Sequence, residues 1–141
     1  MYLNNDFIYE AIAKLESIIN ISIDIETSRK EYDAMLSIKN KHFIVQAKSV
    51  MRTSNHGLVL SQLEELRNTT GKPIILIAEY ISREGANLLK ERRFNYLDMA
   101  GNASINHGDL MIHVEGQKRK SHHKKNQTKA FQETGLKIIF H

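Results

Sequence analysis

Near the start of the chain, apolar residues recur first at the spacing of a helix and then at the spacing of a strand. Residues 5–19 carry apolar side chains at helical spacing along one face, which predicts an amphipathic helix with Asn5 as its N-cap and Asp6 in its first turn. In the stretch INISIDIE that follows, apolar and polar residues alternate, which is the period of a strand with one buried face. The first 26 residues therefore predict a helix followed by a strand.

Two further strands surround the polar tripeptide Lys39-Asn40-Lys41. The stretches YDAMLSI and HFIVQAKSV flank this short connection, and a polar connection between two apolar stretches predicts a β-hairpin. With a symmetric loop of two or four residues centred on Asn40 and Lys41, Asp33 lies opposite Lys48 on the same face of the sheet.

The remainder alternates between helical and strand patterns. Residues 56–69 return to helical spacing and are closed by Gly71 and Pro73. The stretch PIILIAEY is apolar on both faces, as in a strand that helices cover on both sides, and Ser82 caps a helix over about residues 83–93. Three short β segments follow, namely FNYLD, ASI and LMIHV, and the residues between the first two have turn chemistry: Asp98, Gly101 and Asn102.

This order predicts one α/β domain over residues 1–116, with a mixed central β-sheet flanked by helices. Residues 117–129 have no periodic apolar face and are interpreted as a basic linker. Residues 130–141 regain apolar side chains, but they are too few for a core, so they are either the start of a further helical unit or a docking segment.

Charge is distributed unevenly along the chain. Residues 1–117 hold 13 Lys and Arg against 15 Asp and Glu, a balance of −2, whereas residues 118–141 hold 7 against 1, a balance of +6. Such a basic segment can lie along a polyanion and release its counterions, or it can be a solvated connector. In the first case the predicted DNA-binding residues are Lys118, Arg119, Lys120, Lys124 and Lys125.

The composition narrows the class of protein. The chain contains no cysteine, which excludes a disulfide scaffold and thiolate metal sites. No apolar run is long enough to span a membrane, and the acidic, amphipathic start is unlike a signal peptide, so we expect a cytoplasmic protein. Ser49, Ser54 and Ser61 lack the sequence context of a serine nucleophile, which argues against covalent serine catalysis.

The predicted hairpin brings together residues that suit metal-assisted hydrolysis of a phosphodiester. Gln46 and Lys48 are two residues apart and therefore share a face, with Asp33 as their expected neighbour. Asp33 can hold Mg²⁺, the Gln46 amide oxygen can add a ligand, and Lys48 can position a water molecule or offset phosphate charge. Glu10 on the first helix is the candidate for a second carboxylate, with Glu16 as the alternative. Charged residues on a strand face are also common without any site, so a solvent-facing role remains the competing interpretation.

The order of elements through YDAML, FIVQAK, the helix with SQLEEL and the strand PIILIA resembles the PD-(D/E)xK, or restriction-endonuclease-like, nuclease superfamily. The resemblance covers about residues 5–115. Asp33 matches the Asp of the motif, and Gln46-Ala47-Lys48 matches its second half with Gln in place of a carboxylate, which is similar to the Mrr-type restriction enzymes. Gln62 falls where related nucleases often carry a helix glutamine. The resemblance implies a nuclease fold and a magnesium site, although the missing carboxylate at Gln46 weakens the binding of a divalent cation.

A second resemblance covers YISREGANLLKERRFNYLDMAGNASI and, after the basic connector, AFQETGLKIIF. These segments are similar to AbiEi-type antitoxins and transcriptional regulators, in which such a domain precedes a winged helix. The resemblance implies that the chain is the N-terminal part of a longer protein with a C-terminal winged-helix domain, and that it binds DNA.

Three hypotheses of function follow. The first is a Mg²⁺-dependent DNA nuclease that uses Asp33, Gln46 and Lys48, with Glu10 assisting. The second is a nuclease-like domain, weak or inactive as an enzyme, of a DNA-binding regulator. The third is a protein-interaction module without affinity for nucleic acid, and a homodimer is compatible with all three.

Overall fold

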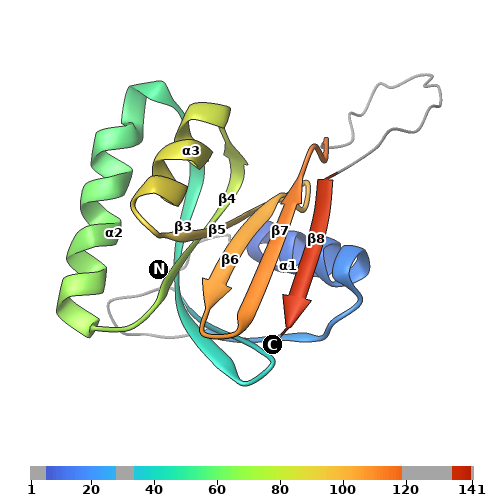
Figure 1. Cartoon of the computed structure of the whole chain (residues 1–141). Helices are drawn as coiled ribbons and strands as arrows, with labels where there is room; N and C mark the ends of the chain where they lie inside the picture. The colour runs from blue at the N-terminus through green and yellow to red at the C-terminus, as the bar shows by residue number, and fades with distance from the viewer. Residues whose placement is uncertain (1–5, 28–33, 119–134, 141) are drawn as a thin grey trace.

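The structure is a computed structural model, and it describes residues 6–27, 34–118 and 135–140. One mixed sheet runs through it in the strand order β1-β2-β3-β4-β5-β6-β7-β8 (Figure 1). The strands are β1 (Ile23–Thr27), β2 (Ala34–Ile38), β3 (Lys41–Met51), β4 (Ile74–Ile81), β5 (Asn95–Asp98), β6 (Ala103–His107), β7 (Leu110–Glu115) and β8 (Gly135–Phe140). The longer helices are α1 (Asp6–Ile19), α2 (His56–Thr70) and α3 (Arg83–Glu91), and a short 3-10 helix, η1 (Thr53–Asn55), precedes α2. The predicted α/β class, with a mixed sheet flanked by helices, is confirmed.

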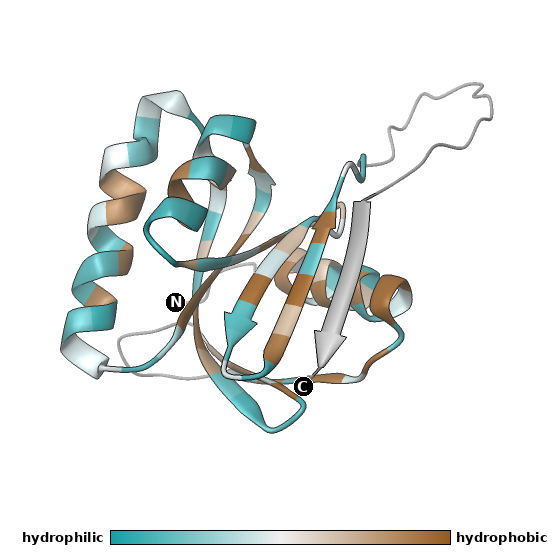
Figure 2. Cartoon of the chain, in the orientation of Figure 1, coloured by the Kyte–Doolittle hydropathy of each residue, from teal (hydrophilic) through white to brown (hydrophobic). Residues whose placement is uncertain are grey.

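The helices cover opposite faces of the sheet (Figure 1). The apolar stripe of α1 packs on one face against side chains such as Val45 and Ile77. On the other face α2 buries Leu63 and α3 buries Leu89 against Ile44 and Leu76. Figure 2 shows the corresponding pattern, with hydrophobic residues concentrated on the strands and on the inner sides of the helices. Because β4 is covered on both sides, its sequence reads as a continuous apolar run.

The hairpin between β2 and β3 has the predicted even loop, but its centre is different. Ile38 pairs with Lys41, so the turn consists of Lys39 and Asn40, and both have positive φ (49° and 68°). Two successive positive φ angles make the tight turn whose twist suits a two-residue hairpin loop. The expectation of a loop centred on Asn40 and Lys41 is therefore wrong, and the pairing in the described hairpin is shifted by two residues.

Other boundaries move by a few residues. Ile19 remains in α1, and the strand predicted from it begins only at Ile23, because the backbone N–H of Ile23 donates to Glu16 at 2.7 Å and the chain turns between them. The C-terminal segment is a strand, not a helix: β8 pairs antiparallel with β7. Of the two alternatives for residues 130–141, the described part therefore fits docking onto the sheet.

No helix among the described residues is long and apolar enough to cross a membrane.

Candidate functional site

Gln46 and Lys48 lie side by side on the α2 face of the sheet. β3 and β4 are parallel, and their register sets Gln46 beside Leu76 and Lys48 beside Ala78. Leu76 and Ala78 belong to the core under α2, and residues paired across neighbouring strands share a face. The predicted common face of Gln46 and Lys48 is thus confirmed, and both side chains are half-buried.

Neither side chain has a partner in the described part of the chain. No carboxylate there lies within 4.0 Å of the Lys48 ammonium, and Gln46 makes no side-chain hydrogen bond. A half-buried ammonium loses part of its hydration, so a site that leaves it unpaired favours an incoming anion.

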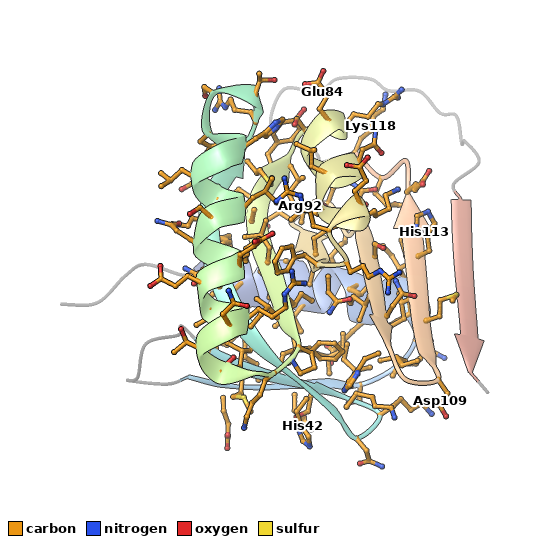
Figure 3. The ribbon with its side chains drawn as sticks, turned by 60° about the vertical axis from the view of Figure 1, so that its left-hand side comes forward. His42, Glu84, Arg92, Asp109, His113 and Lys118 are labelled. Carbon is orange, nitrogen blue, oxygen red and sulfur yellow. The ribbon has the colours of Figure 1, made fainter. Side chains whose placement is uncertain are left out.

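Gln62 on α2 adds an amide to the same region. Its Oε1 is buried and has no hydrogen-bond partner among the described residues. Glu64 and Arg67 lie roughly 140–160° around the helix from it. Those two contact Arg92, which Figure 3 shows between α2 and α3, so that flank of α2 faces α3. Gln62 consequently lies on the opposite flank, toward β3.

The level of Gln62 along the sheet matches that of Lys48. His56 begins α2 and is 3.2 Å (Nε2 to Oγ) from Ser82, which follows β4. Gln62 is six residues, or about 9 Å, further along the helix. Lys48 is beside Ala78, four residues or about 13 Å before Ser82 along β4. The two levels differ by about one strand residue, so Gln62 lies at about the height of Lys48 along the sheet. We refer to Gln46, Lys48 and Gln62 together as the β3–α2 strip.

The predicted carboxylates are distributed differently. Glu10 is exposed on α1, and α1 covers the face of the sheet opposite to the strip. Glu16, the alternative, accepts the backbone N–H of Ile23 and thereby orders the connection to β1. Asp33 lies outside the described residues. Among the residues that are described, no group of three His, Asp or Glu side chains could hold a metal ion.

Of the five basic residues predicted to bind DNA, the structure describes one. Lys118 is exposed, whereas Arg119, Lys120, Lys124 and Lys125 lie outside the described residues.

A second polar region, which sequence reasoning interpreted only as a turn, lies at the end of β5. The turn is confirmed: Asp98 Oδ1 accepts the backbone N–H groups of Ala100 (2.9 Å) and Asn102 (3.0 Å), while Asp98 Oδ2 accepts Asn102 Nδ2 (3.0 Å). Burial raises the pKa of the Asp98 carboxyl, and the hydrogen bonds from Asn102 and Ala100 oppose that shift. Asn102 also binds the backbone of Gln117 in both directions, which fixes the chain just before Lys118.

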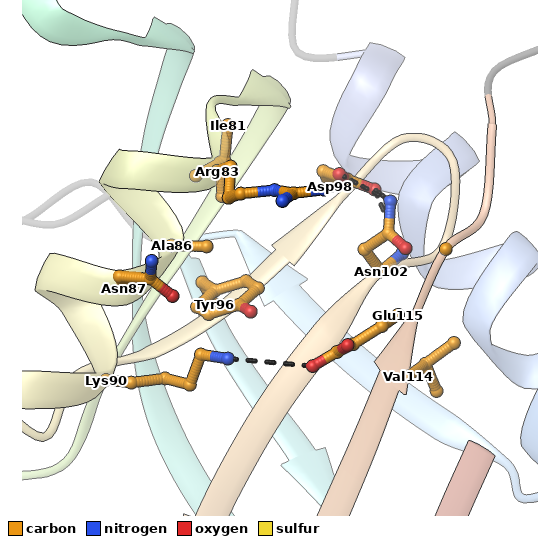
Figure 4. Close-up of a pocket in the computed structure, with 11 residues that line it drawn as sticks. Ile81, Arg83, Ala86, Asn87, Lys90, Tyr96, Asp98, Asn102, Val114 and Glu115 are labelled. Carbon is orange, nitrogen blue, oxygen red and sulfur yellow. Dashed lines mark hydrogen bonds and ion pairs between the residues drawn. The ribbon is translucent and has the colours of Figure 1, made fainter. Parts of the chain in front are cut away.

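The same turn forms one end of a pocket of about 540 Å³ between α3, β5 and β7 (Figure 4). Tyr96 of β5 is 4% exposed and lines it, and Arg83 of α3 extends toward Asp98. On the far side Lys90 Nζ lies 3.7 Å from Glu115, which also binds His113. The hydrogen bond with His113 and the charge of Lys90 lower the pKa of Glu115, whereas its slight burial opposes the shift.

Tyr96 gives a pH-dependent prediction. Burial, together with the charges of Glu115 and Asp98, raises its pKa from 10.0 to about 12. A group whose pKa is higher in the folded state contributes stability below the unfolded pKa and loses it as the pH rises through the folded pKa. We expect the fold to lose stability between pH 10 and 12, and we expect less loss in Tyr96→Phe. Denaturant unfolding across that range, with the ultraviolet absorbance of tyrosinate, measures both; identical curves for the two proteins would contradict the assignment.

Comparison of the chain with models of protein families, with curated proteins and with solved structures found no match in any of the three.

Proposed function

We propose that this chain is a nucleic-acid-associated domain of restriction-endonuclease-like type, and that the β3–α2 strip binds the phosphodiester backbone beside a Mg²⁺ site. The observation that carries the proposal is the strip itself. It consists of a half-buried lysine without an ion pair in the described residues, a neighbouring half-buried amide, and a buried amide oxygen that has no partner there. The element order α1-β1-β2-β3-α2-β4 also agrees with the order on which the sequence resemblance rests.

Each residue of the strip has a definite chemical role in this proposal. Lys48 binds a non-bridging phosphate oxygen and offsets the negative charge that develops on the phosphate during attack. Gln46 offers its amide oxygen as a ligand, and Asp33 supplies the carboxylate that a hard divalent cation needs. When bound, Mg²⁺ polarises the phosphate and lowers the pKa of a coordinated water molecule. Gln62 Oε1, which has no partner among the described residues, would accept a hydrogen bond from a water molecule beside the phosphate.

The proposal is tested by cleavage of supercoiled, linear and single-stranded DNA with Mg²⁺ or Mn²⁺. Lys48→Ala should lower the rate by roughly 100-fold or more, because removing one charge-stabilising donor typically has this effect. Asp33→Ala should abolish the metal-dependent reaction while the fold is kept. Lys72→Ala is the matched control, since Lys72 is exposed on the connection before β4. Equal rates for Lys48→Ala and the control would overturn the proposed site.

One observation favours a second function, a DNA-binding regulator without cleavage. Gln46 stands where the nuclease motif has a carboxylate, and one negative charge fewer weakens the binding of a divalent cation. This alternative predicts no cleavage with either metal, but duplex binding that Lys48→Ala weakens. If the wild-type chain neither cleaves nor binds nucleic acid, a protein-interaction module is the remaining hypothesis.

A substitution of Gln62 distinguishes a functional role of the β3–α2 strip from a structural one. A buried acceptor without a partner costs about 1–2 kcal/mol of stability, so Gln62→Leu is expected to raise the free energy of unfolding by about that amount. The same substitution should weaken DNA binding or cleavage. Urea unfolding and a DNA assay on one protein batch measure the two effects. Ser61→Ala, at the exposed neighbouring position, serves as control. A loss of stability in Gln62→Leu would show that the amide has a structural partner.

A further inference from the structure

The pocket between α3, β5 and β7, which we call the α3 pocket, presents hydrogen-bond donors to a ligand. Arg83 and Asn87 lie four residues apart on one face of α3 and line the pocket. Both side chains are exposed, and neither has a hydrogen-bond partner in the described part of the chain. The Tyr96 hydroxyl also has no partner there. Tyr96 is 96% buried, and Figure 4 shows its ring between Asn87 and Glu115, inside the pocket.

The acceptors of the pocket, in contrast, are largely taken. Asp98 Oδ1 already accepts three N–H groups, and Glu115 is bound by Lys90 and His113. Asp98 Oδ2 has a single partner, Asn102, and Glu115 Oε1 has none among the described residues, so each of these two oxygens has capacity for another donor. An occupant that fits must therefore be rich in acceptors at the α3 side and present an N–H group toward one of these carboxylates, of which Asp98 is the buried one.

We propose that the α3 pocket binds a single nucleotide unit, either a free nucleoside monophosphate or an unpaired nucleotide of a DNA strand. Its phosphate is held by Arg83 and Asn87, the Tyr96 hydroxyl donates to an acceptor of the ligand, and an N–H group of its base donates to Asp98 Oδ2. The proposal concerns a different place from the β3–α2 strip and stands without it.

Charge and size agree with this occupant. Two cations, Arg83 and Lys90, and two carboxylates, Asp98 and Glu115, line the pocket, so a phosphate meets no net repulsion. Arg83 forms no ion pair with any described residue and can bind that phosphate, whereas Lys90 is paired with Glu115. The pocket volume of about 540 Å³ lies within the range of small-ligand sites and exceeds what a bare phosphate ion fills. The Tyr96 ring together with Ala86 gives the base an apolar and aromatic wall.

The test is a calorimetric titration of the chain with the four nucleoside monophosphates and, separately, with inorganic phosphate, without metal ion or duplex. At least one nucleotide should bind more tightly than phosphate. Asn87→Ala and Tyr96→Phe should each weaken that binding about tenfold, because each removes one hydrogen bond to the ligand. Tyr80→Phe is the matched control, since the Tyr80 side chain is 55% exposed and does not line the pocket.

Two further titrations distinguish the source of the nucleotide. A duplex with one unpaired nucleotide that binds more tightly than both the perfect duplex and the monophosphate, in a Tyr96-dependent way, identifies the DNA strand. Binding of the monophosphate with no such preference identifies the free nucleotide. The proposal is overturned if no nucleotide binds, if phosphate binds as well as every nucleotide, or if Tyr96→Phe and Asn87→Ala bind like the control. A failure here leaves the Lys48 dependence of cleavage as a separate result.

Discussion

Replacement of Asp98 by alanine is expected to lower the free energy of unfolding by roughly 3 kcal/mol. The carboxylate accepts the backbone N–H groups of Ala100 and Asn102 and the side-chain amide of Asn102, and the first of these is fully buried. Alanine leaves the two backbone donors without this acceptor, whereas the Asn102 side-chain amide keeps the Gln117 carbonyl. Each unsatisfied buried donor costs about 1–3 kcal/mol. Relief of the buried charge, which is indicated by the raised pKa of Asp98, offsets part of this loss.

Asp109→Ala provides the matched comparison, because Asp109 also lies in a turn between strands but is exposed. It forms a surface ion pair with Lys41 at 3.4 Å, and such pairs contribute about 0–1 kcal/mol. Denaturant unfolding of both variants measures the difference. Equal, small losses in the two variants would contradict the role of Asp98 in ordering its turn.

Gly101→Val is expected to lower the free energy of unfolding by about 3 kcal/mol as well. Gly101 has a φ of 99°, a conformation that branched side chains avoid, and a Cβ atom there would lie 2.6 Å from Ile18 Cδ1 and 3.0 Å from Lys14 Cγ. The turn must therefore move away from α1 or strain its backbone. Asp98 and Asn102 of the same turn line the α3 pocket, so the substitution should also disturb this pocket.

Gly57→Val is the control for this substitution. Gly57 lies in α2, and no atom comes within 4 Å of a Cβ placed there. Valine and glycine differ by only about 0.5 kcal/mol in helix propensity, so Gly57→Val should be nearly neutral. If thermal or urea unfolding shows that the two glycine variants lose similar stability, the close approach of Gly101 to α1 is wrong.

Much of the fold could be predicted because the local pattern of apolar and polar residues is enough to indicate many of its helices and strands. The apolar stripe of α1, the continuous apolar run of β4 and the glycine that ends α2 each need only their own neighbours in sequence. The hairpin centre was missed for a physical reason. Either adjacent pair within Lys39-Asn40-Lys41 can be written as a symmetric polar loop, and only the strand pairing of Ile38 with Lys41 selects one.

The candidate site was predictable only in part. A spacing of two residues is enough to put Gln46 and Lys48 on one face, but the choice of face depends on β4 and α2, which are distant in sequence. For the same reason the sequence could not show that α1, which carries Glu10, covers the opposite face. The α3 pocket was missed because Asp98 also has a sufficient local explanation as a turn residue. Asp98 and Tyr96 of β5 share a pocket with Arg83 and Asn87 of α3, and this pocket exists only because β7 forms its opposite wall. The sequence alone does not show that β7 lies there.

Anomalous scattering from crystals of the chain soaked in Mn²⁺ tests the proposal that the β3–α2 strip is a phosphate and metal site. We expect a Mn²⁺ ion within coordination distance of the Gln46 amide oxygen, on the α2 face of the sheet and beside Lys48, and we expect that ion to be lost in Asp33→Ala. Mn²⁺ bound only elsewhere on the protein, or a strip filled by a neighbouring side chain that pairs with Lys48, would contradict it.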